Sequence, residues 1–93
     1  RYGKKVYSNI NFKTNEKIFL VFGSESYGID RTILANNLEN TFRIPTTKDI
    51  RSLNLSNTVS IVLYEAMRQN DFINLELEEP EELKGKDFLL KYK

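Results

Sequence analysis

The longest uninterrupted hydrophobic run in the chain covers residues 18–22, Ile-Phe-Leu-Val-Phe, and Gly23 ends it. A short run of β-branched and aromatic residues is typical of a strand buried on both faces, as in a parallel sheet that helices cover. A second short run at residues 41–44 stops at Pro45, which has no backbone N–H to donate to a strand ladder. The pattern therefore predicts two strands.

Two further segments have hydrophobic residues at helical spacing. Asp30 stands where a side-chain cap is expected for the first of them. The apolar positions of this helix are Ile33, Leu34 and Leu38. The second helix is expected over residues 56–69, and Asn70 ends it. Its apolar stripe consists of Leu55, Val59, Val62, Leu63, Ala66 and Met67.

The order strand, helix, strand, helix predicts an α/β fold, a parallel sheet flanked by helices. Sheets of this kind normally have more than two strands, so part of the fold is expected to be missing from these 93 residues. The domain portion is expected to cover residues 1–73. Residues 74–93 form a charged C-terminal tail with Pro80 and Gly85 as breakers, which can hold at most a short helix.

Cysteine and histidine are both absent, which excludes disulfides, thiolate nucleophiles, zinc–thiolate sites and imidazole catalysis. No apolar run approaches the roughly 20 residues of a membrane-spanning helix. These absences favour a cytoplasmic protein that uses neither a metal nor a membrane. Charge is uneven: residues 1–17 hold five basic residues and one acid, and residues 71–93 hold seven acids and four lysines. A basic end can lie near phosphates, although charge alone favours a solvated lysine-rich edge.

Polar loops follow both predicted strands. Ligands of open α/β sheets bind outside the carboxyl ends of the strands, where Gly23 and Ile44 lie. The loop 23–29 has neither a dinucleotide-binding nor a phosphate-gripping motif. Taken singly, its two glycines are explained by turn geometry. Glu25 is equally well explained as a solvated acid near a helix start and as a functional residue.

Four small polar residues surround the start of the second helix: Ser52, Asn54, Ser56 and Asn57. Helix capping accounts for one or two of them, and the others can hold a polar ligand or a backbone loop. No side chain nearby would activate a hydroxyl as a nucleophile. The chemistry indicated is positioning of reactants, not covalent catalysis.

The stretches "IFLVFGSESYGI" and "FRIPTTKDIRSLNLSNTVSIVLYEAMRQ" together resemble the second and third conserved motifs of the SPOUT-class, trefoil-knot RNA methyltransferases. Within that class the chain is most similar to the tRNA (cytidine/uridine) ribose 2′-O-methyltransferases of the wobble nucleotide. The match covers roughly residues 7–72 in order and spacing. The resemblance implies a deep backbone knot that holds S-adenosylmethionine. It also implies that the substrate is a tRNA.

The resemblance also implies roles for individual residues. Those expected to bind the cofactor are Gly23, Ile44, Ser52 and Leu53. Those expected to act in the transfer are Glu25, Ser52 and Asn54. Glu25 would stabilise the cofactor loop or the active-site arginine, and the other two would lie nearest the methyl group and the ribose. The second helix would carry much of a homodimer interface, and no metal is needed.

The chain departs from the family pattern in two places. Ser24 stands where this branch usually has proline. The first motif, an Asn-rich segment with an arginine, is absent, so the chain is expected to be the C-terminal half of a methyltransferase, truncated or partial, and inactive alone. The alternative is a non-catalytic RNA-binding or dimerisation module that retains only this half of the knot. A third possibility, an unrelated small α/β domain, predicts a cooperative fold from these residues alone.

Overall fold

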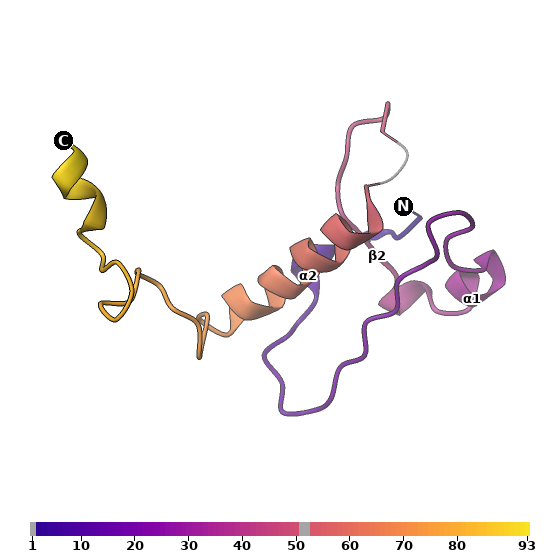
Figure 1. Ribbon diagram of the computed structural model, residues 1–93. Coiled ribbons are helices and arrows are strands. Elements are labelled where there is room, and N and C mark those ends of the chain that lie inside the picture. The colour runs from indigo at the N-terminus through magenta and orange to yellow at the C-terminus, as the bar shows by residue number, and fades with distance from the viewer. Residues whose placement is uncertain (1, 51–52) are drawn as a thin grey trace.

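The computed structural model describes residues 2–50 and 53–93. Its sheet has two parallel strands, β1 (Lys5–Val6) and β2 (Phe42–Arg43), with Lys5 opposite Phe42 and Val6 opposite Arg43. The long connection between them contains η1 (Tyr7–Asn9), α1 (Arg31–Ala35) and η2 (Leu38–Asn40), as Figure 1 shows. The strand predicted at residues 41–44 is confirmed in its two central residues. The sequence analysis missed β1, because two residues carry no readable periodicity.

The hydrophobic run at residues 18–22 is not a strand in this structure. Leu20 and Phe22 are half-buried, whereas Phe19 and Val21 are 83% and 74% exposed. The prediction of a strand buried on both faces is therefore wrong here. The physical reason is that a strand needs a neighbour for its backbone N–H and C=O groups, and none of the described residues pairs with this run.

The helix α1 begins as predicted, because the Asp30 carboxylate accepts a hydrogen bond of 2.7 Å from the Thr32 N–H. It is shorter than predicted, and Leu38 lies in the separate turn η2. The reason is local competition by asparagine for backbone groups. The Asn37 side chain donates to the Ile33 carbonyl oxygen at 2.8 Å, where a continuing helix would place a backbone N–H.

The helix α2 (Leu55–Gln69) is the longest element and begins one residue earlier than predicted. Its N-cap is Asn54, whose side chain accepts a hydrogen bond from the Asn57 N–H. The chain leaves the helix at Asn70, and Asp71 and Phe72 then adopt left-handed φ angles of 58° and 54°. The prediction of this helix and of its end is confirmed.

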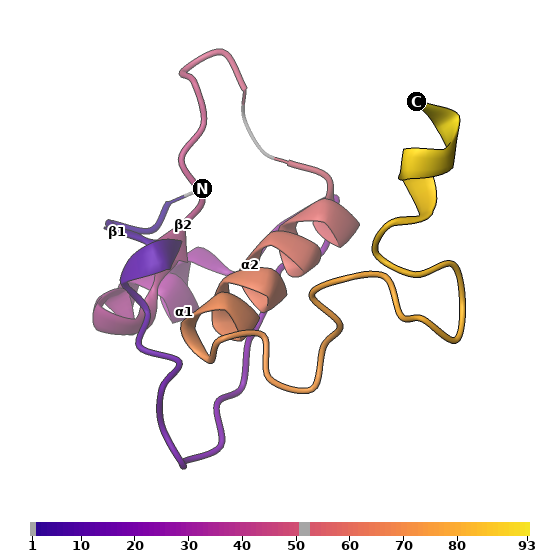
Figure 2. The same cartoon turned by 90° about the vertical axis from the view of Figure 1, so that its left-hand side faces the viewer.

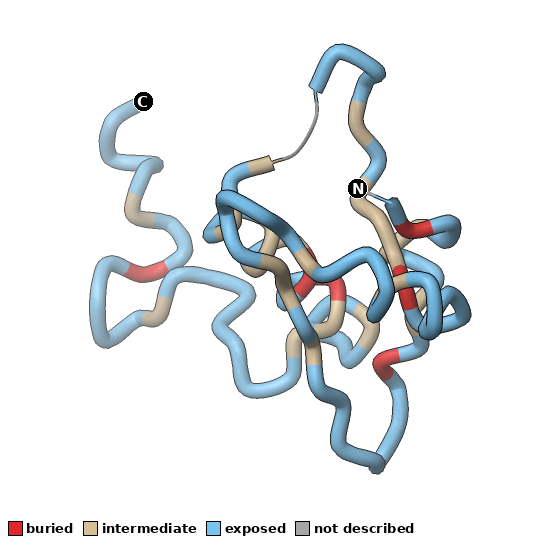
Figure 3. Tube along the Cα trace, turned by 90° about the vertical axis from the view of Figure 1, so that its right-hand side faces the viewer, coloured by how far each residue is buried: buried red, intermediate tan, exposed pale blue. Residues whose placement is uncertain are grey.

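Burial is limited and scattered along the chain, as Figure 3 shows. Phe12 and Val62 are the buried hydrophobic residues among those described, and Thr41 and Glu65 are buried polar residues. Phe12 lies near the C-terminal end of α2, because the Gln69 side chain accepts a hydrogen bond of 2.8 Å from its N–H. The N-terminal segment is thus held against α2 across 57 residues of sequence.

The C-terminal tail extends away from the sheet and from α1 in both views of the ribbon (Figures 1 and 2). It turns at residues 80–85, where the Gly85 N–H donates to the Pro80 carbonyl oxygen at 2.9 Å. Gly85 has a φ of 80°, which favours glycine. A short 3₁₀-helix, η3 (Phe88–Tyr92), ends the chain, so the short helix anticipated in this tail is present.

Candidate functional site

The loop after residue 22 is a tight, backbone-lined turn. A Cβ atom at Gly23 would lie 2.4 Å from the Gly28 carbonyl carbon, so no larger residue fits there without a backbone shift. The Gly28 N–H donates to the Ser24 carbonyl oxygen at 2.9 Å, and the Tyr27 N–H donates to the Ser24 Oγ at 3.0 Å. Gly23 is therefore required by the close approach of the backbone, and Gly28 is favoured by its left-handed φ of 67°. Glu25 is exposed in this loop.

The other predicted site residues flank the loop that joins β2 to α2. Ile44 directly follows β2 and is half-buried, as is Leu53. Ser52 lies outside the described residues, and so its predicted roles in cofactor binding and transfer stay predictions. Asn54 is exposed at the first turn of α2.

Capping uses only part of the Asn54 side chain. Its Oδ1 accepts from the Asn57 N–H at 3.3 Å, and its backbone oxygen accepts from the Thr58 N–H and the Thr58 Oγ1. The Nδ2 atom donates to no atom of the residues that the structure describes. The use of this amide donor by a polar ligand stays a prediction.

The three predicted segments are not joined directly. Within residues 2–50 and 53–93, no hydrogen bond connects the loop 23–29 to residues 44–50 or to residues 53–54. Two hollows, one on α2 and the turn after it and one in the C-terminal tail, are lined by other residues. The gathering of Gly23, Ile44 and Leu53 around one ligand therefore stays a prediction.

The structure adds a cluster of polar side chains that the sequence analysis did not single out. Glu65 is only 8% exposed. Its carboxylate accepts hydrogen bonds from Arg68 Nε at 2.8 Å, Arg68 Nη2 at 3.0 Å and Gln69 Nε2 at 2.8 Å. The hydrogen bonds from Arg68, and then the one from Gln69, lower the pKa of Glu65 to about 2. The signal in the sequence was the i, i+3, i+4 spacing of these three residues.

This cluster fixes the N-terminal segment to α2. Gln69 Nε2 also donates to the Ile10 carbonyl oxygen at 2.8 Å, and Asn70 Nδ2 donates to the Phe12 carbonyl oxygen at 3.2 Å. Since Glu65 holds Gln69 in place, the carboxylate acts on residues 10–12 through that amide. The cluster therefore has a structural role that orients the start of the connection leading to the loop 23–29.

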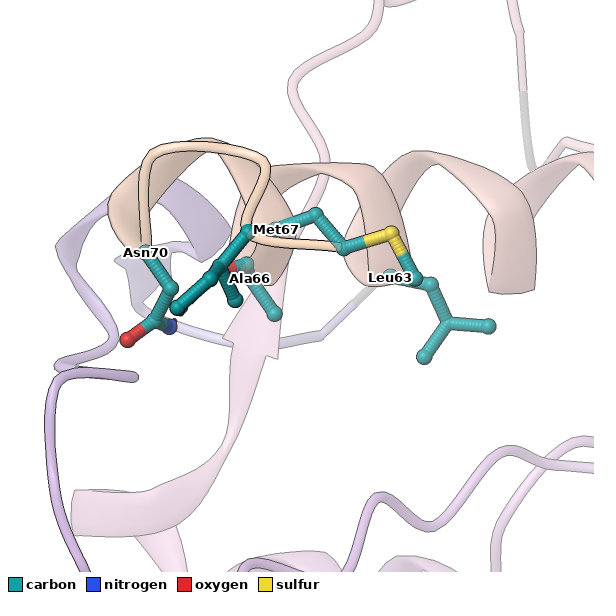
Figure 4. A pocket seen from close by; sticks show the side chains of 5 residues that line it. Leu63, Ala66, Met67 and Asn70 are labelled. Atoms are coloured by element: carbon teal, nitrogen blue, oxygen red, sulfur yellow. Dashed lines mark hydrogen bonds between the residues drawn. The ribbon is translucent and has the colours of Figure 1, made fainter. Parts of the chain in front are cut away.

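An apolar hollow lies on α2 and the turn that follows it (Figure 4). Leu63 and Met67, one helical turn apart, line it together with Ala66, Asn70 and Ile73. Leu63, Met67 and Ile73 are all exposed. The stripe predicted from helical spacing therefore faces solvent over part of its length.

The fold and the motifs define a class of protein. The SpoU rRNA Methylase family matches residues 1–64, which is more than half of the chain. The chain therefore belongs to the SpoU rRNA Methylase family, and the family resemblance of the two sequence motifs is confirmed.

Individual relatives of the chain share a more specific name than the family. A protein of Listeria monocytogenes named "Putative tRNA (cytidine(34)-2′-O)-methyltransferase" is 49% identical over 81 residues, which is 86% of this chain and 47% of the relative. A protein of the same name from Geobacillus stearothermophilus is 43% identical over 76 residues, 81% of this chain and 48% of the relative. The chain spans about half the length of the curated relatives that it matches.

A solved structure shares the fold. The crystal structure of an RNA methyltransferase from Bacillus anthracis, titled as putative, is 40% identical, with a TM-score of 0.76 over 84% of this chain and 50% of that chain. The predicted α/β class with its parallel sheet and helices is confirmed, and the fold is that of the SPOUT methyltransferases.

The described residues lack two further features. No helix among them is both long and apolar enough to cross a membrane. No group of three or more Asp and Glu side chains within the same residues could hold a metal ion.

Proposed function

We propose that the protein containing this chain transfers a methyl group from S-adenosylmethionine to the ribose 2′-hydroxyl of the wobble pyrimidine of a tRNA, at cytidine 34. The observation that carries this proposal is the 49% and 43% identity to proteins named for that reaction, over 86% and 81% of the chain. Those alignments are long enough to include most of the two motifs. The family match supports the same reaction class.

The residues present fit such a cofactor by their chemistry. S-adenosylmethionine supplies an electrophilic methyl group when it is bound. Gly23 packs closely against the Gly28 backbone and so keeps the loop tight, and Ile44 and Leu53 are half-buried apolar residues. Backbone N–H and C=O groups of a tight loop can bond the polar edges of a nucleoside, and aliphatic side chains can cover its ring faces. No charged side chain is needed at these positions.

Asn54 is proposed as the residue that orients the acceptor. Its Oδ1 is held by the helix cap and its Nδ2 is left to donate, so a ribose oxygen would meet a fixed amide. Ser52 and Glu25 are proposed as its partners in positioning. Such alignment of donor and acceptor can lower a barrier without a covalent intermediate. This suits a chain without cysteine or histidine.

We further propose that two copies associate through α2. The exposed side chains around the hollow, Leu63, Met67 and Ile73, support this, because clustered apolar residues on a helix are typical of an interface. A cytoplasmic location and a knotted backbone in the full-length protein belong to the same proposal.

The test uses the full-length gene product, S-adenosylmethionine with a tritiated methyl group, and an anticodon stem-loop RNA. Methyl transfer is expected to this RNA and not to a matched RNA with 2′-deoxycytidine at the wobble position. Transfer to both RNAs, or to neither, contradicts the proposal. RNA binding without methyl transfer would instead favour the alternative, a non-catalytic RNA-binding or dimerisation module.

A further inference from the structure

The C-terminal segment 84–93 carries lysines and aromatic rings that the candidate site does not use. The family match ends at residue 64. The segment contains four lysines, one aspartate, one phenylalanine and one tyrosine within ten residues. We refer to residues 84–93 as the C-terminal arm.

The rings and the ammonium groups of the arm are already in contact. Phe88 and Tyr92 meet edge to face, with their centroids 5.7 Å apart and their planes at 68°. Lys91 Nζ lies 4.2 Å from the Phe88 centroid and 5.4 Å from that of Tyr92. Lys84 Nζ lies 5.4 Å from the Phe88 centroid. Positive charges and aromatic rings thus lie side by side in one short helix, η3, and the residues just before it.

The acidic residues before the arm carry more charge than the arm itself, but they form no salt bridge with its lysines in the described part of the chain. Residues 76–82 hold five glutamates, and together with Lys86 they line an open hollow. Even so, no lysine of the arm forms an ion pair with any residue that the structure describes. Tyr92 is 70% exposed. The Tyr92 ring is therefore exposed to a ligand, and the Lys84 and Lys91 ammonium groups contact rings of the arm but no carboxylate of the described residues.

We propose that the C-terminal arm binds single-stranded RNA, with a nucleobase stacked on Tyr92 and phosphates contacted by Lys84 and Lys91. This rests on the proposed function, which makes an RNA the substrate. Aromatic rings interleaved with basic residues suit unpaired nucleotides, because every base has a face that can stack and every nucleotide carries a phosphate. A lipid surface is the weaker match, since η3 has only five residues and amphipathic membrane helices are much longer.

The glutamates of residues 76–82 act against the arm in this proposal. They repel phosphates within about a Debye length, which is near 8 Å at physiological salt. Binding is therefore expected to be confined to a short unpaired stretch, such as one that the rest of the protein already holds nearby.

The test measures fluorescence anisotropy of a fluorescein-labelled single-stranded oligoribonucleotide of mixed sequence with the full-length protein. Phe88→Ala with Tyr92→Ala is expected to weaken binding about tenfold. Leu89→Ala is the matched control, because Leu89 is an exposed residue of the same helix and offers no ring. Lys84→Gln with Lys91→Gln should also lower the slope of log affinity against log salt by about one to two. Replacing Glu78 and Glu79 with glutamine should raise affinity.

The inference is overturned by no binding by the wild type, by equal loss in the Leu89→Ala control, or by binding of the arm to anionic lipid vesicles in preference to RNA. Circular dichroism confirms that each variant keeps its helix content. Methyl transfer by the wild type separates this inference from the proposed function. If transfer occurs and the KM for tRNA is unchanged in the double alanine variant, the arm has no role; if no transfer occurs, the proposed function fails instead.

Discussion

The helix α2 and the run at residues 18–22 both have a clear hydrophobic pattern, amphipathic in α2 and continuous in the run, yet only α2 forms as its pattern predicts. A helix satisfies its backbone from within its own segment, whereas a strand depends on a neighbour that the chain must supply from elsewhere. Among residues 2–50 and 53–93, no segment pairs with residues 18–22, and Phe19 and Val21 face solvent. A hydrophobic pattern within one segment is therefore enough to predict a helix. A strand also requires a second segment that pairs with it.

The strongest way to break this comparison is to place a charge inside α2. Val62 is 6% exposed, so Val62→Asp would bury a carboxylate with no partner and should cost about 3 kcal/mol of unfolding free energy. The loss is measured by urea unfolding followed by circular dichroism, with sedimentation to report assembly. Ser60→Asp, at an exposed position of the same helix, is the control. An unchanged unfolding free energy and sedimentation profile for Val62→Asp would contradict the burial.

The link between α2 and the N-terminal segment should be the next largest contribution. Gln69→Ala would leave the Phe12 N–H and the Ile10 carbonyl oxygen without this amide, at a cost of about 2 kcal/mol. Amide hydrogen exchange at Phe12 should accelerate more than exchange at the middle of α2. Asn70→Ala removes one 3.2 Å hydrogen bond to Phe12 and one 2.9 Å hydrogen bond within the end of α2, to the Ala66 carbonyl oxygen, and should accelerate exchange at Phe12 less. If Gln69→Ala accelerated exchange equally at Phe12 and at the middle of α2, the Gln69 side chain would stabilise the whole fold and not this contact alone.

Acid should loosen the same link. The pKa of Glu65 is lowered to about 2 from 4.5, so the folded state favours the ionised carboxylate. Stability from this group is fully present above pH 4.5 and is lost as the pH falls toward 2. Unfolding followed between pH 5 and 2 should show this decline, and Glu65→Gln should flatten it. A decline of the same size in the variant would assign the effect to other carboxylates.

Sequence reasoning predicted the parts of the fold and site that depend on near neighbours. Asp30 and Asn54 were expected near helix starts and cap α1 and α2, and Gly23 was expected in a turn that now shows a close backbone approach. The pairing of Lys5 with Phe42 and the burial of Glu65 were not predicted. Both depend on residues far apart in sequence, or on a neighbour that only the fold supplies.

A smaller change tests whether Asn54 is more than a cap. Asn54→Ala should cost about 1 kcal/mol of stability, as the loss of an N-cap does. In the full-length protein it should lower turnover about a hundredfold if its Nδ2 positions the ribose. Asn54→Asp keeps the capping oxygen and loses the donor, so it should restore stability but not turnover. If Asn54→Asp restored both stability and turnover, Asn54 would be a structural cap only. Ser52→Ala is expected to lower turnover more than stability in the same way.

The smallest effect is expected in the run that lacks a strand partner. In the 93-residue chain, Phe19→Thr should change the unfolding free energy by less than about 0.5 kcal/mol, because Phe19 is 83% exposed. Leu20→Thr is the matched change at a half-buried neighbour and should cost more, about 1 kcal/mol. Urea unfolding of both variants measures the difference. A larger cost at Phe19 than at Leu20 would mean that the run buries the side chains of residues 19 and 21 instead of those of residues 20 and 22. The run would then differ from α2 in which of its side chains are buried, and the lack of a paired strand would not explain the difference.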